Sequence, residues 1–396
     1  MIGALTPPPR RLRIIILGLS ITSSWGNGHA TTYRSLMRAL CRRGHEVLFL
    51  ECDKPWYRAH RDLRHPPYGT VALYDRIGQL RRRWAGEVRD ADLVVVGSYV
   101  PDAIAVAAWV REVSTGLVAF YDIDTPVTLA ALAQGNCAYL DRAAIPRFDL
   151  YLSFTGGPAL NLIESRYGAR AARALYCAVD PDRHQPVAAE PRWALGYLGT
   201  YSSDRQPKLD ALLCEPARHS PDARFAVAGP LYPPELRWPG NVERIEHVGP
   251  DGHARFYGRQ HFTLNLTRAD MVRLGYSPSV RLFEAAACGV PIITDWWPGL
   301  ATIFAPGSEI LVARDGGDVL RLLRETPEVE RLALAGRARR HVLANHTAAH
   351  RAALLERYVE EAAAPACAGN NAARPAFSSE EAGGDPPRRL EAVPPQ

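Results

Sequence analysis

The stretch that decides the fold, residues 277–295, reads SPSVRLFEAAACGVPIITD. Ser277 can cap a helix and Pro278 fits the first helical turn. The run EAAAC then continues the helix to Gly289, a residue type that ends helices. Residues 290–294 follow as a short apolar strand, so the stretch predicts a helix followed by a buried strand of an α/β sheet.

The start of this helix carries the residue types from which a phosphate site is made. A helix N-terminus attracts phosphate through free N–H groups and the macrodipole, and Ser279 stands at that end. Glu284 lies farther into the helix, where a carboxylate can accept hydrogen bonds from two ribose hydroxyls. Arg281 either contacts the same ligand or forms a structural ion pair with Glu284, one turn on. The helix start is therefore predicted to hold a nucleotide diphosphate.

Strand and helix patterns alternate along the rest of the chain. Such alternation indicates parallel sheets that are covered by helices on both faces. The predicted strands are residues 12–19, 46–50, 92–97, 117–123, 149–154, 174–179, 194–199, 225–228, 242–247, 262–266, 290–294 and 309–312. We therefore expect two doubly wound, Rossmann-like domains of α/β class that face each other across a cleft, with ligands at the carboxyl ends of the strands.

The pattern breaks in the middle of the chain, at the Pro-containing and charged residues 180–191. The break predicts an N-terminal Rossmann-like domain, 1–185, and a C-terminal one, 192–346. Residues 347–363 form a last long helical pattern. Beyond it, residues 365–396 lose all periodicity and become rich in Ala, Gly, Pro and charge, which predicts a disordered tail.

Composition excludes several classes of protein. A chain of 396 residues is long enough for two domains, and its net charge of +5 is too small for a dedicated nucleic-acid binder. The seven cysteines include no CxxC pair, as expected for a reduced, cytoplasmic protein without a disulfide framework or zinc site. No apolar segment is long enough to span a bilayer. The sequence leaves the oligomeric state open.

An amphipathic segment, residues 75–89, carries the densest basic cluster, in which Arg81, Arg82 and Arg83 stand beside Trp84. One interpretation is a helix with a solvated basic face, which is the usual role of a charge run. The other is peripheral contact with a membrane surface.

The loop after the first strand, SSWGNGHATTYRSL at residues 23–36, is a candidate for the reacting centre. Gly26 and Gly28 let the backbone approach a ligand closely. His29 starts the next helix and is a candidate general base, since the free pKa of histidine lies near neutrality. A helix-capping or merely exposed histidine is equally consistent with this position. Thr31 replaces the third glycine of a G-x-G-x-x-G fingerprint, which argues against a dinucleotide site.

Two acids, Asp122 and Asp124, end the predicted strand 117–123 within the sequence YDIDTP. At that position they could orient a histidine, bind a metal or accept hydrogen bonds from substrate hydroxyls. Asp124 precedes a Thr-Pro turn, so a turn cap is its alternative role. Asp122 is the weaker functional candidate of the two.

Basic residues follow two strands of the second domain. Thr200 lies in the turn after that domain's first strand, and Arg205 and Lys208 come next, placed to reach a diphosphate. Arg268 follows strand 262–266 and could touch phosphate or sugar. The alternative for Arg205 and Lys208 is an ordinary surface charge.

At these residues the chain resembles a GT-B glycosyltransferase, and most closely the CgeB-like group of the spore maturation protein type. The resemblance covers about residues 13–346 and rests on the phrases YDIDTP, YLSFTGG, GYLGTYSSDRQPK and LTRADMVRLGYSPSVRLFEAAACGVP. It implies a nucleotide-sugar donor in the C-terminal domain and an acceptor in the N-terminal one. It also implies that helix 347–363 crosses back to pack on the first domain.

The resemblance implies roles for three donor-site residues. Glu284 matches the glutamate that binds the donor ribose in related retaining enzymes. Arg205 and Lys208 match the basic pair that holds the diphosphate. Those enzymes carry a second glutamate eight positions earlier than the first, where this chain has Tyr276, and this departure puts a retaining mechanism in doubt.

The resemblance also bears on the reacting centre. His29 falls where inverting GT-B enzymes place their catalytic base, and Asp124 or Asp122 could orient it. Inversion needs such a base to deprotonate the acceptor hydroxyl, whereas a retaining front-face reaction does not. These residues therefore favour inversion without deciding it.

We expect a glycosyltransferase of hexosyl type that moves a sugar from a nucleoside-diphosphate sugar to an unidentified acceptor, without a metal or a cofactor. GT-B enzymes generally need no metal, because basic residues and a helix dipole offset the charge of the leaving group. A sugar-nucleotide epimerase with the same fold and nucleotide site is one alternative. A non-catalytic nucleotide-sugar-binding protein is another, because Tyr276 could mark a lost active site.

Overall fold

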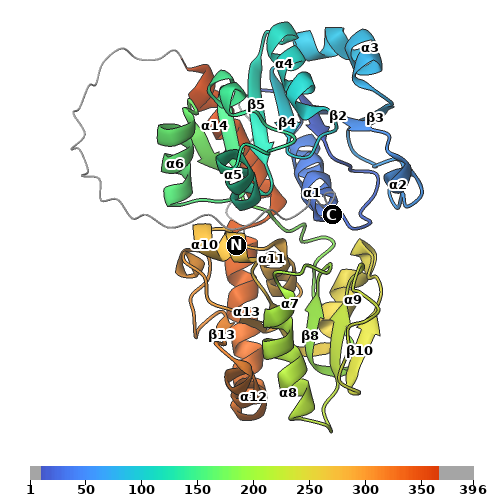
Figure 1. Cartoon of the computed structure of the whole chain (residues 1–396), viewed down its shortest axis with the longest axis vertical. Coiled ribbons are helices and arrows are strands. Elements are labelled where there is room, and N and C mark those ends of the chain that lie inside the picture. Colours follow the sequence, from blue (N-terminus) through green and yellow to red (C-terminus); the bar gives the residue numbers. More distant parts are fainter. Residues whose placement is uncertain (1–9, 365–396) are drawn as a thin grey trace, which may run out of the picture.

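The computed structural model describes residues 10–364, which form two lobes stacked along the long axis of the molecule (Figure 1). The first lobe holds a seven-stranded sheet in the order β3-β2-β1-β4-β5-β6-β7, and every pair in it is parallel. Its strands are β1 (Arg13–Gly18), β2 (Glu46–Cys52), β3 (Thr70–Tyr74), β4 (Leu93–Gly97), β5 (Leu117–Asp122), β6 (Leu150–Ser153) and β7 (Ala172–Ala174).

The second lobe holds a six-stranded parallel sheet in the order β10-β9-β8-β11-β12-β13. The expected α/β class with two doubly wound parallel sheets is therefore confirmed. The strands of this lobe are β8 (Trp193–Leu198), β9 (Phe225–Ala228), β10 (Val242–Ile245), β11 (Gln260–Asn265), β12 (Ile292–Thr294) and β13 (Leu311–Val312).

Helices connect the strands and cover both sheets (Figure 1). Those of the first lobe are α1 (Gly28–Arg42), α2 (Pro55–Arg58), α3 (Ile77–Asp90), α4 (Ala103–Val113), α5 (Thr125–Ala133), the 3₁₀ helix η1 (Arg142–Arg147) and α6 (Pro158–Tyr167). Those that follow are α7 (Gln206–Leu209), the π-helical turn η2 (Asp210–Cys214), α8 (Glu215–Arg218), η3 (Pro250–Gly252), α9 (His253–Gly258), α10 (Ala269–Leu274), α11 (Val280–Ala287), η4 (Leu300–Thr302), α12 (Gly316–Glu325), α13 (Glu328–Asn345) and α14 (Ala348–Ala363).

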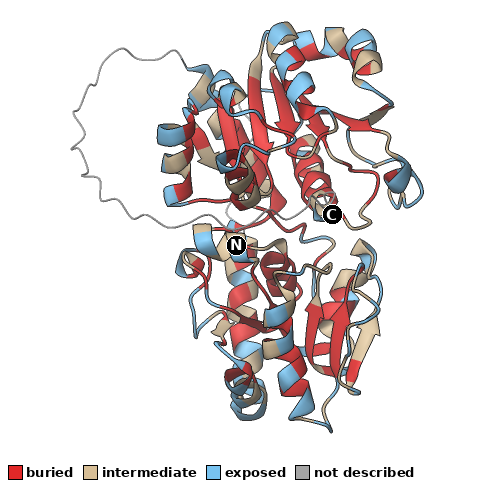
Figure 2. Cartoon of the chain, in the orientation of Figure 1, coloured by how far each residue is buried: buried red, intermediate tan, exposed pale blue. Residues whose placement is uncertain are grey.

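The central strands are buried along their length and are red in Figure 2, whereas the edge strands β3, β10 and β13 are largely of intermediate burial. Strand β4, with the sequence LVVVG, is buried at every position, and β9, with the sequence FAVA, is too. Such continuous apolar runs of β-branched and small residues are typical of parallel strands with helices on both sides. Burial of these runs therefore fixes each sheet at the centre of its lobe.

In both sheets the order of the strands reverses at the first strand. Strand β1 lies between β2 and β4, and β8 lies between β9 and β11. In doubly wound sheets this switch point opens a crevice beyond the carboxyl ends of the strands, where ligands bind. The loops after β1 and β8 both line one crevice between the lobes, so the topology itself positions the site.

Helix α14 leaves the second lobe and packs on the first, as expected from the resemblance (Figure 1). Ala352, Leu355 and Val359 of this helix are buried in the core beneath β1 and α1. The carboxylate of Glu356 accepts hydrogen bonds from Arg43, with Nε at 2.5 Å and Nη2 at 2.6 Å. The last helix therefore ties the chain end to the opposite lobe.

Several predicted elements differ from the observed ones. Strand 174–179 is placed wrongly, because the sheet ends with β7 and the following residues cross to the second lobe; Val179 forms an isolated bridge with Thr347. The predicted cap Ser277 is also wrong. Ser279 caps α11 instead, and its hydroxyl accepts from the backbone N–H of Arg281 at 3.4 Å. The predicted tail 365–396 lies outside the described residues.

The amphipathic segment forms α3, with Leu80, Trp84 and Val88 buried on one side. The guanidinium groups of Arg81, Arg82 and Arg83 lie on exposed positions, as expected for a solvated face. Within residues 10–364, no helix has the combination of length and apolar character needed to cross a membrane. The six cysteines in that range are all free thiols.

Candidate active site in the interlobe crevice

The crevice between the lobes has a volume of about 260 Å³ and is lined from both sides. The first lobe contributes the loop after β1 and the start of α1. The second lobe contributes the turn after β8, the segment before α9 and the start of α11. The lining residues used below are Gly26, Gly28, Thr200, Arg205, His247, His253, Tyr257, Ser279, Arg281 and Glu284. Most of the residues predicted to hold a donor are thus brought together.

Helix α11 points its N-terminus into the crevice, since Ser279, Val280 and Arg281 all line it. The first N–H groups of a helix have no partners within the helix and carry partial positive charge. Only one of them is bonded by the Ser279 side chain. The remaining groups make this helix end a place where a phosphate is stabilised.

Glu284 lies one turn into α11 and is 3 % exposed, yet it forms part of the crevice wall. One oxygen, Oε1, is 3.6 Å from Nε2 of His184, and Oε2 is 3.4 Å from Nδ1 of His253. Burial raises the cost of its charge, but His253 and His184 outweigh burial and lower the Glu284 pKa to about 2. The carboxylate is therefore ionised and available as a hydrogen-bond acceptor.

Arg281 is held by the sheet instead of forming the alternative pair with Glu284. Its Nε donates to the carbonyl of Leu198, and its Nη1 donates to Oδ1 of Asn265 at 3.1 Å. Its guanidinium also stacks over the Tyr197 ring at 4.8 Å. These contacts fix a positive charge at the crevice wall beside the start of α11.

Arg205 reaches the crevice from the turn after β8. Its Nη2 donates to the carbonyl of Thr200 at 2.7 Å, which folds the turn around the side chain. Its Nε is buried, and no hydrogen-bond acceptor for it exists among the described residues. A buried guanidinium donor without an acceptor is costly unless a ligand supplies one, so the geometry leaves Arg205 ready for an anion.

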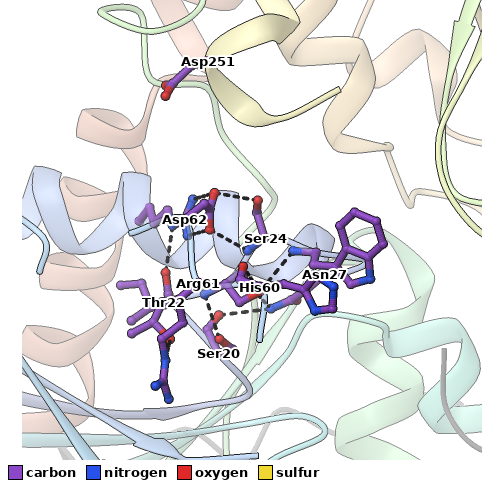
Figure 3. Close-up of polar contacts among 12 residues, drawn as sticks. Ser20, Thr22, Ser24, Asn27, His60, Arg61, Asp62 and Asp251 are labelled. Atoms are coloured by element: carbon purple, nitrogen blue, oxygen red, sulfur yellow. Dashed lines mark hydrogen bonds and ion pairs between the residues drawn. The ribbon is translucent and has the colours of Figure 1, made fainter. Parts of the chain in front are cut away.

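The loop after β1 is held rigidly by two carboxylates. Glu51 accepts from Ser20 Oγ at 3.0 Å and from Thr22 Oγ1 at 2.6 Å. Asp62 accepts from Ser24 Oγ at 2.7 Å and from the guanidinium of Arg34. Figure 3 shows the contacts of Ser20, Ser24 and Asp62 within this network. A loop fixed in this way presents Gly26 and Gly28 to the crevice in one conformation.

Asn27 and Trp25 complete this loop. The Asn27 side chain caps α1 by accepting from the backbone N–H of His29 at 3.1 Å, and its Nδ2 donates to the carbonyl of Ser20 at 3.2 Å (Figure 3). Trp25 stacks on His60 with ring centroids 4.6 Å apart and meets His247 of the second lobe at 4.9 Å. The loop therefore also forms an aromatic contact between the lobes.

His29 sits at the start of α1, next to the loop glycines. Its ring lies 5.5 Å from that of Tyr99, and its buried Nδ1 has no hydrogen-bond partner within the described chain. Burial lowers the His29 pKa, and the negative charge of Asp124 opposes this shift. The imidazole is therefore neutral near pH 7, the form that can accept a proton.

Asp124 lies between the lobes. Its Oδ2 accepts from the Tyr99 hydroxyl at 3.0 Å and is 3.7 Å from Nη1 of Arg268 in the second lobe. Arg268 also approaches Asp204 at 3.7 Å. The structure thus places Arg268 as an interlobe ion-pair partner of Asp124 rather than on the crevice wall.

Solved structures with the same architecture identify the fold. A sucrose-phosphate synthase from Thermosynechococcus elongatus superposes with a TM-score of 0.66 at 14% identity, covering 89% of this chain and 99% of that one. The Anabaena protein HepE, solved with UDP and glucose, gives 0.66 at 12% identity over 89% and 100% of the two chains. An alpha-glucosyltransferase solved with UDP and DNA gives 0.65 at 12% identity over 89% and 100%.

A family model described as glycosyl transferase-like matches residues 205–357. The chain has the GT-B fold. The matched region begins at Arg205 on the crevice wall, contains α11 with Glu284, and ends within α14. No curated protein matches the chain.

Besides His29, Asp124 and Arg268, which do not line the crevice, two further residues predicted for the site lie elsewhere. Asp122 is fully buried and accepts from Thr128 Oγ1 at 2.6 Å and from the Tyr151 hydroxyl at 2.6 Å, so it is a core residue that cannot orient His29 directly. Burial raises the Asp122 pKa to about 6. Lys208 contacts Oδ2 of Asp295 at 2.5 Å and does not line the crevice. Of the expected basic pair, only Arg205 faces the site.

Sequence reasoning missed the residues that surround Glu284. His253 starts α9, Tyr257 lies one turn later, and His184 belongs to the linker between the lobes. Tyr276, at the position where related retaining enzymes have a glutamate, packs against Gly157 and Gly299 between the lobes and accepts from the N–H of Gly156 at 3.0 Å. The i, i+4 spacing of His253 and Tyr257 on one helix face is the one signal that could have been used.

Proposed function

We propose that this protein is a glycosyltransferase that takes its sugar from a UDP-sugar bound in the crevice and transfers it to an acceptor hydroxyl presented by the first lobe, without a metal ion in the reaction. The observation that carries the proposal is the ionised Glu284 carboxylate on the crevice wall, one turn inside the exposed start of α11. HepE and the alpha-glucosyltransferase were both solved with UDP, which supports uridine as the donor base.

The second lobe would hold the nucleotide. Glu284 accepts hydrogen bonds from the two ribose hydroxyls, a charged contact that a neutral side chain cannot match. Arg205 and the N-terminus of α11 contact the diphosphate, whose negative charge grows as the bond to the sugar breaks. Arg281 adds a fixed positive charge to this wall. Resident cations and a helix dipole thus supply the charge that a metal would otherwise provide.

The first lobe would present the acceptor. His29 Nδ1, or Nε2 after a ring flip, takes the proton of the acceptor hydroxyl while its oxygen attacks the anomeric carbon and UDP departs. Asp124 stabilises the imidazolium that forms. Gly26 and Gly28 allow the sugar to approach the backbone closely. The motifs quoted for the CgeB-like group support placing the enzyme in that subtype.

Calorimetry with UDP and 2′-deoxy-UDP tests the ribose contact. Wild type should bind UDP about 10- to 100-fold more tightly than Glu284→Gln does, the range of a charged hydrogen bond. Glu284→Gln should no longer distinguish the two ligands, because the partner of the hydroxyl is lost. Glu330→Gln, an exposed change on α13, is the matched control. Equal UDP affinities for wild type and Glu284→Gln would refute the site.

Turnover is tested by following UDP release from a panel of UDP-sugars. If UDP release depends on His29, the result supports the role of His29 as the general base. The anomeric configuration of the product, determined by NMR, distinguishes inversion from retention. A retained configuration would remove His29 from the reaction while leaving the donor site intact.

A further inference from the structure

Three side chains from separate parts of the chain converge beside the crevice. They are His184 of the linker, His253 at the start of α9 and Glu284 of α11, and their ligand atoms all lie within 4.8 Å of one another. Two imidazoles and one carboxylate form a common donor set for Zn²⁺ and related divalent ions. The question is whether the contacts here are those of hydrogen bonds or of metal ligands.

Two separations in this cluster match those between metal ligands, while the three ligand atoms together span up to 4.8 Å. Two ligands on one tetrahedral Zn²⁺ lie roughly 3.3–3.5 Å apart, given bonds of about 2.0–2.2 Å. Glu284 oxygens stand 3.6 Å from His184 Nε2 and 3.4 Å from His253 Nδ1. Both spacings exceed those of ordinary nitrogen–oxygen hydrogen bonds.

His184 is already oriented as a ligand. It is 2 % exposed, and its Nδ1 lies 3.3 Å from the carbonyl of Asp180, an acceptor that requires Nδ1 to carry the hydrogen. In the neutral ring the lone pair is then on Nε2, which is buried, faces Glu284 and has no hydrogen-bond partner in residues 10–364. Metal-binding histidines are held in this way, with the second ring nitrogen donating to a carbonyl or carboxylate. A lone pair facing a carboxylate is repulsive unless a cation lies between them.

We propose that His184, His253 and Glu284 form a binding site for one divalent transition-metal ion of the Zn²⁺ type. Three protein ligands leave a fourth position open for water. The site shares Glu284 with the proposed donor site, but no step proposed for sugar transfer draws on the ion.

The site has a consequence for the donor that rests on the proposed function. If Glu284 also holds the ribose, then the ion and UDP compete for the same carboxylate oxygens. Bound Zn²⁺ should lower the affinity for UDP, and bound UDP should lower the affinity for Zn²⁺ by the same factor, because such coupling is reciprocal.

Titration calorimetry of tag-free, full-length protein with ZnCl₂ tests the metal site. Wild type should bind one equivalent, and His184→Gln, His253→Gln and Glu284→Gln should each bind about 100-fold or more weakly, at or above the loss seen for outer-shell changes. His261→Gln removes an exposed histidine and should bind like wild type. Absence of a stoichiometric site in wild type, or wild-type binding by all three variants, would overturn the proposal.

Two further measurements do not depend on how the variants fold. Anomalous scattering at the zinc edge from wild-type crystals should place the ion among the three side chains, and an ion only elsewhere would refute the site. Zinc titration at saturating UDP separates the two proposals. Loss of zinc affinity supports both, whereas unchanged one-to-one zinc binding keeps the metal site and refutes the ribose contact of Glu284.

Discussion

His29 is expected to stay neutral to lower pH than a free histidine does, because burial lowers its pKa. A base must be unprotonated, so UDP release from the donor should persist below pH 6.5 and fall as His29 takes up a proton. Asp124 opposes the effect of burial, so Asp124→Asn should move this acid limb to still lower pH. His29→Ala should lower the rate by about 10²- to 10⁴-fold and abolish the limb. These expectations are checked by measuring the rate of UDP release as a function of pH for wild type, Asp124→Asn and His29→Ala.

The rate profile can contradict this role in two ways. An unchanged acid limb in His29→Ala would assign the titration to another group. A shift to higher pH in Asp124→Asn would show that Asp124 does not act on His29 through its charge.

Arg205 should recognise the diphosphate through its planar fork. Arg205→Ala is expected to lower the affinity for UDP by about 10- to 100-fold, as expected when a charged hydrogen bond is lost. Arg205→Lys should restore only part of the affinity, since an ammonium cannot bind two oxygens side by side. Calorimetry with uridine, which has no phosphate, should give the same affinity for all three proteins. Arg218→Ala, an exposed change on α8, serves as the control.

A local pattern located Glu284, which lines the crevice, whereas contacts made by partners on distant elements could not be read from the sequence. Glu284 stands out because a carboxylate follows a helix start. Asp122 was ranked below Asp124, but the contacts that separate the two, with Tyr151 and Tyr99, come from other elements and could not be predicted. His184 could not be related to Glu284, since only the fold brings the linker to α11.

At the scale of elements, Ser279 is expected to stabilise α11 and prepare its N-terminus for phosphate. Ser279→Ala should lower the unfolding free energy by about 1 kcal/mol, as for other lost helix caps. It should also lower the affinity for UDP. Ser279→Asp keeps a capping oxygen and should preserve stability, but its charge should repel the diphosphate and weaken UDP further. Urea denaturation and calorimetry separate the two effects. Equal UDP binding by wild type and Ser279→Asp would argue against a phosphate at this helix end.

The sequence determines most elements because burial imposes their periodicity. Helix α6 was predicted with the observed bounds, since Pro158 and Gly168 mark its two ends. Strand β3 was missed, because it lies at the edge of the sheet, pairs only with β2 and is largely half-exposed. Strand 174–179 was misplaced, because Cys177 and Val179 are buried by packing between the lobes rather than by sheet pairing. Tertiary burial cannot be distinguished from strand burial in a short apolar run.

At the scale of the whole molecule, the two lobes are joined by more than the linker. Helix α14 returns to the first lobe, Thr155 and Ser277 form a hydrogen bond between the lobes, and Arg268 reaches Asp124. Ligands bound between such lobes draw on both of them, so closure couples the donor side to the acceptor side. The strength of the α14 contact then sets how firmly the lobes are held.

Glu356 is the residue whose loss should loosen this contact. It is 6 % exposed and is contacted by Arg43 and by the buried His45, whose Nε2 lies 2.6 Å away. Removing the carboxylate takes away the acceptor that Arg43 and His45 share at this contact, so Glu356→Ala should lower the unfolding free energy by about 3 kcal/mol. Hydrogen exchange should rise in α14 more than in β4 and β5. Glu360→Gln, exposed on the same helix, should change neither measurement.

The same cluster predicts how stability depends on pH. Burial opposes ionisation of Glu356, but Arg43 and His45 outweigh it and lower the Glu356 pKa below its ordinary value of 4.5. The stabilisation is therefore present above pH 4.5 and is lost as the pH falls toward the folded-state value, because the unfolded chain binds the proton first. Glu356→Gln cannot titrate and should lose less stability than wild type over that range. Urea denaturation of both proteins from pH 6 downward measures the difference, and parallel curves would show that Glu356 does not hold α14 through its charge.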